Sequence, residues 1–194
     1  AHAIPHTYSP RFVRAGLLVG FALGGFFDGI LLHQVLQWHH LLSALDAGAL
    51  RDLRMQVLAD GLFHAFMYVV GGVGLWLLYR ARHEFSGASA DRILLGAALV
   101  GFGAWHVLDA VLSHWLTGIH RIRMDVADPL PWDVGWLVVF GLAPLFAGMA
   151  LRRRHPRTAA IPDRRGGRRA VAAALAALTV LAGAWAALPA AGRG

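Results

Sequence analysis

The chain of 194 residues is 57% hydrophobic and 15% charged, with a mean hydropathy of +0.54, which predicts an integral membrane protein and excludes an ordinary soluble domain. Its net charge of +7 comes from 18 arginines without a lysine. Because the sequence has no cysteine, disulfides, thiolate metal ligands and cysteine nucleophiles are excluded, and any metal site must use nitrogen, oxygen or methionine sulfur.

Five apolar segments approach the length of about 20 residues that a helix needs to cross a bilayer. None of them alternates between apolar and polar residues as a strand does. We therefore expect an all-α fold, a polytopic membrane helix bundle with about five transmembrane helices. The segments are Phe12–Gln37, Leu53–Tyr79, Ile93–Trp115, Val134–Leu151 and Val171–Leu188.

The first segment is interpreted as a retained helix, because no small-residue cleavage site followed by a polar mature domain marks it as a signal peptide. Its far end is rich in ionisable groups on two stripes. His33, Gln37 and His40 share one stripe, and Asp28 and His39 share the other. A helix that ends near Trp38 would instead free the last two histidines to fold back.

The second and third segments carry acidic and imidazole groups at helical spacing. Asp60 and His64 are an i, i+4 pair, and His106 and Asp109 are an i, i+3 pair. Ser113 continues the second of these stripes. Each pair is therefore expected to face the bundle interior, because ionisable groups are costly in lipid.

The sequence divides into three regions of different composition. We expect residues 1–152 to form a four-helix membrane core rich in histidine and aspartate, residues 153–169 a cytoplasmic arginine-rich loop, and residues 170–194 a peripheral fifth transmembrane helix. Asp125, Asp128 and Asp133 are expected in a solvated outer loop, where Asp133 can also cap the fourth helix.

The arginines set the predicted orientation. Eight of the 18 lie within Arg152–Arg169, and basic loops are retained in the cytoplasm. This places the amino terminus inside, predicts a multi-pass protein of the bacterial inner membrane, and explains the positive charge without nucleic acid. With that orientation and a rise of about 1.5 Å per residue, the ionisable groups of the first three segments fall in the outer half of the bilayer. The predicted site therefore faces the periplasm or the exterior.

Imidazole and carboxylate groups from three helices at one depth predict a transition-metal site. Copper is favoured over iron or zinc, with His33, His64 and His106 as the first ligands. The other candidate metal ligands are His39, His40, His114, Asp60 and Asp109. Supporting positions around the ligands are expected at Asp28, Gln37, Ser113 and His120. A two-metal centre that uses both acidic pairs is a further possibility.

Other interpretations of the same residues stay open. A haem b or quinone protein would use His64 and His106 as an axial pair, although the nearby aspartates would then need partners. A metal carrier would need a polar path to the cytoplasm, and the inner halves of the segments carry none. A structural hydrogen-bond network needs no metal. Besides the lipid bilayer, other membrane subunits or a second copy of the chain are candidate partners.

Three stretches carry a resemblance to a known family. They are FFDGILLHQVLQWHHLLS at Phe26–Ser43, DGLFH at Asp60–His64 and WHVLDAVLSHWLTGIHRIR at Trp105–Arg123. Together they resemble the bacterial DUF2243 membrane family, over about residues 11 to 152. The resemblance implies a compact multi-helix membrane protein in which the three blocks act as one unit, and an association with respiratory oxidase assembly factors. It implies no catalytic residue. A metal-dependent membrane oxidoreductase could be built on the predicted metal site, independently of the resemblance.

Overall fold

The computed structural model describes residues 8–45 and 48–153, and within them every regular element is helical. Four helices are long and apolar enough to cross a membrane: Pro10–Val35, Leu53–Arg80, Ala90–Leu116 and Leu130–Arg153. The prediction of an all-α membrane bundle is confirmed, and the first four apolar segments correspond to these helices. The expected arginine-rich loop and fifth helix lie outside the described residues.

Three of the four long helices change type along their length. The first joins α1 (Pro10–Asp28) to the π-helix η1 (Gly29–Val35), and the third joins α3 (Ala90–Asp109) to the π-helix η4 (Ala110–Leu116). The fourth runs through α4 (Leu130–Trp136), the π-helix η5 (Leu137–Leu142) and α5 (Ala143–Arg153). Only α2 (Leu53–Arg80) is α-helical throughout, and it follows the short 3-10 helix η2 (Gly48–Arg51).

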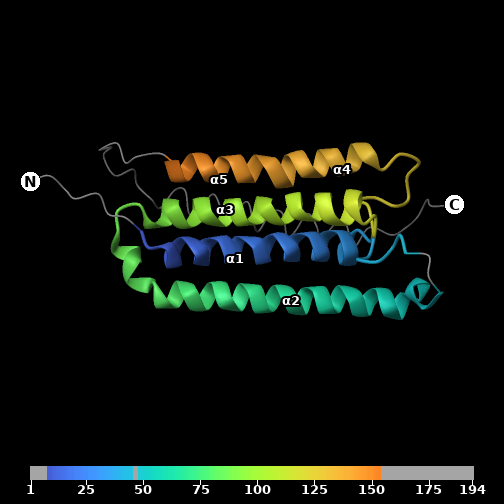
Figure 1. The fold of residues 1–194 in the computed structure, drawn as a ribbon, viewed down its shortest axis with the longest axis horizontal. Helices are drawn as coiled ribbons and strands as arrows, with labels where there is room; N and C mark the ends of the chain where they lie inside the picture. The colour runs from blue at the N-terminus through green and yellow to red at the C-terminus, as the bar shows by residue number, and fades with distance from the viewer. Residues whose placement is uncertain (1–7, 46–47, 154–194) are drawn as a thin grey trace, which may run out of the picture. The chain divides into compact units, whose positions relative to one another are not determined.

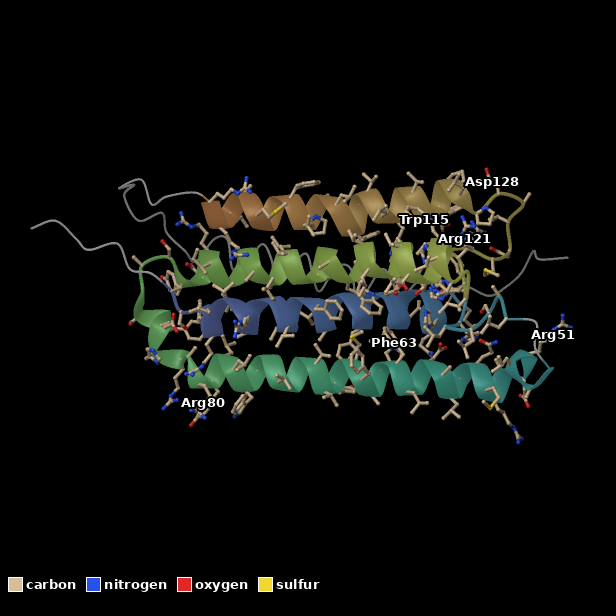
Figure 2. All side chains as sticks on the ribbon, viewed as in Figure 1. Arg51, Phe63, Arg80, Trp115, Arg121 and Asp128 are labelled. Atoms are coloured by element: carbon tan, nitrogen blue, oxygen red, sulfur yellow. The ribbon has the colours of Figure 1, made fainter. Side chains whose placement is uncertain are left out.

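The helices lie side by side in the order α2, α1, α3 and α4–α5, so that α1 and α3 form the central pair (Figure 1). The connecting residues 36–45 and 48–52 lie at the same end of the bundle as the connection 117–129. We call this the histidine end, and Figure 2 places the labelled Arg51, Arg121 and Asp128 there, with Arg80 at the opposite end. That opposite end includes the 3-10 helix η3 (Arg82–Ser86).

Glycines hold the central pair together. A Cβ on Gly20 would lie 1.9 Å from the carbonyl oxygen of Ala98, and a Cβ on Gly101 would lie 2.0 Å from that of Leu17. Only residues without a side chain permit backbones to approach so closely, which is a common basis of helix packing in lipid. This explains the glycine-rich composition of the first and third segments.

Glu84 closes the end opposite the histidines. It is 5% exposed and accepts hydrogen bonds from the backbone nitrogen and the hydroxyl of Ser9, at 2.7 and 2.5 Å. Ser9 in turn accepts a hydrogen bond from the backbone N–H of Phe12, so it caps α1. The start of the first helix is therefore tied to the connection between α2 and α3.

Candidate metal centre

The π-helices turn acidic and imidazole side chains toward the same point. In a π-helix the backbone hydrogen bonds join residues i and i+5, one residue further than in an α-helix. Asp28 and His33 are separated by five positions across the start of η1, and Asp109 and His114 by five across the start of η4. Side chains that α-helical geometry would place apart are thereby brought together.

Two turns then return the chain to the bundle. The first helix ends at Val35, and Gln37 adopts a φ of +52°, while the third ends at Leu116, and Gly118 adopts a φ of +64°. Positive φ reverses the direction of the chain directly after each helix. Of the two alternatives from the sequence, the structure shows the one in which the helix ends before His39 and His40 and the chain folds back. The division into two stripes, with Asp28 apart from His33, is wrong, because a π-helix brings these two residues together.

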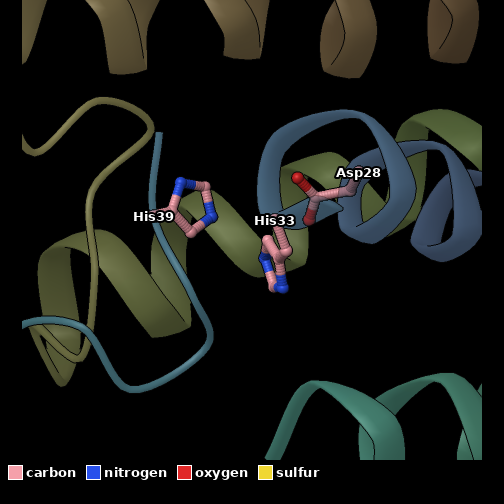
Figure 3. Close-up of side chains that lie close together, drawn as sticks. All are labelled: Asp28, His33 and His39. Carbon is pink, nitrogen blue, oxygen red and sulfur yellow. The ribbon is translucent and has the colours of Figure 1, made fainter. Parts of the chain in front are cut away.

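The first cluster of candidate ligands consists of Asp28, His33 and His39. One ligand atom from each lies within 4.8 Å of the others, and all three residues are at most 3% exposed. Figure 3 shows Asp28 and His33 on the end of the first helix and His39 on the returning loop, beside them. Trp105 donates its indole N–H to Oδ2 of Asp28 at 3.2 Å, which leaves Oδ1 without a hydrogen-bond partner.

The second cluster consists of Asp109, His114 and His120, which also lie within 4.8 Å of one another and are at most 5% exposed. Nε2 of His114 lies 3.1 Å from Oδ2 of Asp109, and Nε2 of His120 lies 3.5 Å from Oδ1. Each cluster thus offers two imidazoles and one carboxylate.

Other groups hold the imidazoles by their Nδ1 atoms. Nδ1 of His33 lies 2.8 Å from Asp60, Nδ1 of His39 lies 2.9 Å from the carbonyl oxygen of Ile122, and Nδ1 of His120 lies 3.0 Å from that of Leu41. Since these partners are acceptors, Nδ1 of His33 and of His39 carries the proton and Nε2 presents a lone pair. His120 differs because its Nε2 also faces an acceptor, the carboxylate of Asp109. Such anchoring is typical of histidines that ligate metals.

Asp60 and Asp133 join the imidazoles to the returning loops. Asp60 accepts hydrogen bonds from His33, from the backbone N–H of Leu41 at 2.9 Å and from Nδ1 of His40 at 2.6 Å. Asp133 lies 3.3 Å from Nδ1 of His114 and accepts from the backbone N–H of Ile122 at 2.9 Å. Arg121 pairs with its second oxygen.

The two clusters meet at His39 and His120. Their rings are stacked, 4.5 Å apart and inclined by 6°. Burial, together with the neighbouring His120 and His33, lowers the pKa of His39 well below its usual value. Burial also opposes protonation of His120, but its hydrogen bond to Asp109 and the charge of that carboxylate outweigh burial and raise its pKa.

His64 and His106 lie outside both clusters, so the described residues do not bring His33, His64 and His106 together as a single ligand set. His106 accepts a hydrogen bond at Nδ1 from the indole N–H of Trp136, at 3.1 Å. Its neutral form therefore carries the proton on Nε2, the atom that would have to bind a metal. His64 is stacked against Phe26, 6.1 Å away between ring centroids.

The remaining predicted positions are less close to the clusters. Gln37 is exposed and Ser113 is half-buried. The prediction of a solvated Asp133 is wrong: it is fully buried at 0% exposure, because the loop that contains Arg121 and Ile122 folds over it, whereas Asp125 and Asp128 are exposed as expected.

One signal in the sequence could have identified the clusters. The spacing Asp-x4-His-x5-His occurs at Asp28, His33 and His39 and again at Asp109, His114 and His120. Searching for i, i+3 and i, i+4 pairs conceals it, because five-residue spacing shares a face only where the helix is a π-helix. A search for internal repeats would have placed His120 among the ligands.

Comparison with known proteins adds the family. No curated protein and no solved structure shows significant similarity to the chain. Residues 15–155 match the family described as "Predicted membrane protein (DUF2243)". The match includes both clusters and all four long helices, except residues 10–14 at the start of α1. The chain therefore belongs to the DUF2243 family of membrane proteins.

Proposed function

We propose that the protein is a membrane metalloprotein that holds transition-metal ions at the histidine end of its bundle, as a resident centre for metal-dependent oxidoreductase chemistry. The ligands are the two imidazoles and the carboxylate of each cluster. By the distribution of arginines, the centre faces the periplasm or the exterior of the bacterial inner membrane.

The observation that carries this proposal is the set of Nε2 atoms without partners. Nε2 of His33, Nε2 of His39 and Oδ1 of Asp28 are buried and have no hydrogen-bond partner among the described residues. Nε2 of His64 and of His106 also has none, but neither imidazole lies in a cluster with a carboxylate and a second imidazole. In the second cluster Nε2 of His114 and of His120 faces Asp109, at 3.1 and 3.5 Å. Buried polar atoms are nearly always satisfied, because desolvation without a partner is costly. A metal ion in the first cluster would satisfy its three unpartnered atoms at once.

The donor set suits redox-active ions. Two histidines and one carboxylate are the ligands of many non-haem iron(II) centres, and imidazole also suits copper and zinc. Three protein ligands leave coordination positions for an exogenous molecule. Copper stays our prediction from sequence, and iron fits the carboxylate-containing set at least as well, so metal analysis must distinguish them.

The packing of the bundle supports a fixed centre over a carrier. Among the described residues, buried polar side chains gather at the histidine end, apart from Glu84 at the opposite end. Between these ends the backbones of α1 and α3 touch at Gly20 and Gly101. This arrangement offers no polar path along which an ion would cross the membrane.

Haem has less support. His106 would have to ligate iron through Nε2 while a donor, Trp136, occupies Nδ1, and a neutral imidazole cannot satisfy both. Aromatic rings of Phe27, Phe102 and Phe140 also pack around His106, at 4.8 to 6.1 Å between centroids. These contacts fill the space next to the imidazole.

The test is elemental analysis with visible and electron paramagnetic resonance spectra, on protein purified in mild detergent without chelators and on protein reconstituted with iron(II) or copper. We expect bound metal without a Soret band, and less bound metal in His33→Ala and in His114→Ala than in the wild type. His64→Ala and His106→Ala are the matched controls, since their side chains lie outside the clusters, and both should retain metal.

Three outcomes would contradict the proposal. They are the absence of metal after reconstitution with either ion, a Soret band, and a metal content that falls in His106→Ala but equals that of the wild type in His33→Ala.

A further inference from the structure

We infer that the centre is dinuclear, with one ion in each half of an internal two-fold repeat and the stacked His39 and His120 at the junction of the halves. This inference rests on the proposed function and specifies the number and arrangement of the ions. Contacts made by the first long helix and its following loop recur in the third long helix and its loop, at residue numbers that are higher by a constant.

The candidate ligands themselves recur. Asp28, His33 and His39 become Asp109, His114 and His120 when 81 is added to each residue number. All six are buried, and each set forms one of the two compact clusters. Identical spacing in two helices, with each set gathered within 4.8 Å, is the expected signature of a duplicated unit.

The turns after the helices recur with the same shift. Trp38 N–H donates to Leu32 at 3.0 Å, and Ile119 N–H donates to Ser113 at 3.0 Å. The equivalent bonds one step earlier are Leu36 to Leu31 at 2.8 Å and Thr117 to Leu112 at 2.9 Å. The residues with positive φ, Gln37 and Gly118, also differ by 81 positions. Both π-helices therefore end in the same way.

The anchoring bonds cross from one half to the other reciprocally. His39 bonds to the carbonyl oxygen of Ile122, and His120 bonds to that of Leu41, so each loop holds the histidine of the other. Reciprocal contacts between equivalent residues require a two-fold axis between the two elements. The parallel stacking of the His39 and His120 rings fits an axis that passes between them.

The flanking helices and the central packing follow the same symmetry. Asp60 contacts His33 and Leu41 with one oxygen, and Asp133 contacts the equivalent His114 and Ile122 with one oxygen. At the opposite half of the bundle, Gly20 approaches Ala98, and Gly101 approaches Leu17, which are again equivalent pairs. The symmetry thus extends along the whole central pair.

The two clusters are close enough to act as one centre. Ring centroids are 4.6 Å apart for His33 and His39, 4.5 Å for His39 and His120, and 5.1 Å for His120 and His114. The four imidazoles therefore form a continuous row, and the carboxylates Asp28 and Asp109 accompany its two halves. In protein sites with two metals the ions lie about 3.5–4 Å apart, so the ligands of both ions must form one compact group, as this row of imidazoles does.

The residues that break the symmetry support the same assignment. The position equivalent to His106 is Gly25, and the position equivalent to His64, counted from Asp60 and Asp133, is Leu137. Neither of these can bind a metal. His64 and His106 thus lie outside the repeated constellation, in agreement with their placement outside both clusters.

The test compares one variant of each half. Wild-type protein, reconstituted with excess iron(II) and desalted, should hold two ions per chain. His33→Ala and His114→Ala should each hold one, and the double variant none, with Asp128→Asn as an exposed control that keeps two. If an alanine variant is lost to misfolding, Asp28→Asn and Asp109→Asn replace it, since they retain shape. Electron paramagnetic resonance of the wild-type centre, which should show magnetic coupling between the ions, needs no variant.

The outcomes separate this inference from the proposed function. One ion per chain that both single variants abolish would mean one mononuclear site shared by the halves, which overturns the dinuclear centre and leaves the metalloprotein standing. Two ions without magnetic coupling, lost independently, would also overturn a joint centre. Absence of any metal would remove the proposed function itself.

Discussion

At the scale of single residues, the site depends on groups that fix the imidazoles rather than on the imidazoles alone. Asp60 holds both His33 and the returning loop, and Asp133 does the same for His114. Carboxylates in this position orient a ligating histidine and raise its basicity. In the proposed metal centre, Asp60 and Asp133 would therefore tune metal affinity without touching the metal.

We predict that Asp60→Asn weakens metal binding about 10-fold to 100-fold, because the amide keeps the shape but removes the negative charge beside His33. The number of ions bound at saturation should stay unchanged. Competition with a chromophoric chelator measures the affinity, and Asp128→Asn is the control because that carboxylate is exposed. Equal affinity in Asp60→Asn and wild type would contradict the role given to Asp60.

The sequence predicted most of these residues and grouped them differently. His33, His39, Asp28 and Asp109 were recognised because ionisable groups are conspicuous in apolar segments. Asp133 was assigned to a solvated loop, since its burial depends on how Arg121 and Ile122 fold over it, and this is tertiary information. His106 shares an α-helical face with Asp109, but its tautomer depends on Trp136 from another helix.

At the scale of elements, the four spans could be predicted and the π-helices could not. Length and hydropathy determine a membrane-spanning helix, so four of the predicted segments match described helices to within a few residues. A π-turn has no distinct pattern of apolar residues. In this protein a π-helix begins directly after Asp28 and another directly after Asp109, and each changes the direction in which the following side chains point.

The π-helices η1 and η4 each end in a turn with positive φ, and the two turns use different residues. We predict that Gly118→Ala lowers the free energy of unfolding by about 1 kcal/mol, because a Cβ is disfavoured in the left-handed region. Gln37→Gly removes that strain and should not destabilise. Thermal unfolding in detergent measures both, and Gly72→Ala, in open space on α2, is the control. Equal stability of Gly118→Ala and Gly72→Ala would contradict the strained turn.

At the scale of the whole molecule, the four described helices form a two-fold pair of helical hairpins with all candidate ligands at one end. The apolar side chains on the outside of α2, such as Leu62 at 64% exposure and Val69 at 65%, fit contact with lipid. The arginine distribution predicts that the histidine end faces outward, and this orientation determines which compartment supplies the metal and the reactants.

The absence of cysteine makes the orientation simple to test, because one introduced cysteine is the only thiol in the chain. We predict that Asp128→Cys, exposed at the histidine end, reacts with a membrane-impermeant maleimide on intact spheroplasts. His83→Cys, exposed at the opposite end, should react only after lysis. The reverse pattern of labelling would place the histidine end in the cytoplasm.

The number of metal ions per chain tests the central claim most directly. Plasma mass spectrometry on the wild-type protein, reconstituted and freed of loosely bound ions, should find two iron or copper ions per chain. A chain that holds no metal under these conditions would contradict the account and leave the buried histidines as a structural hydrogen-bond network.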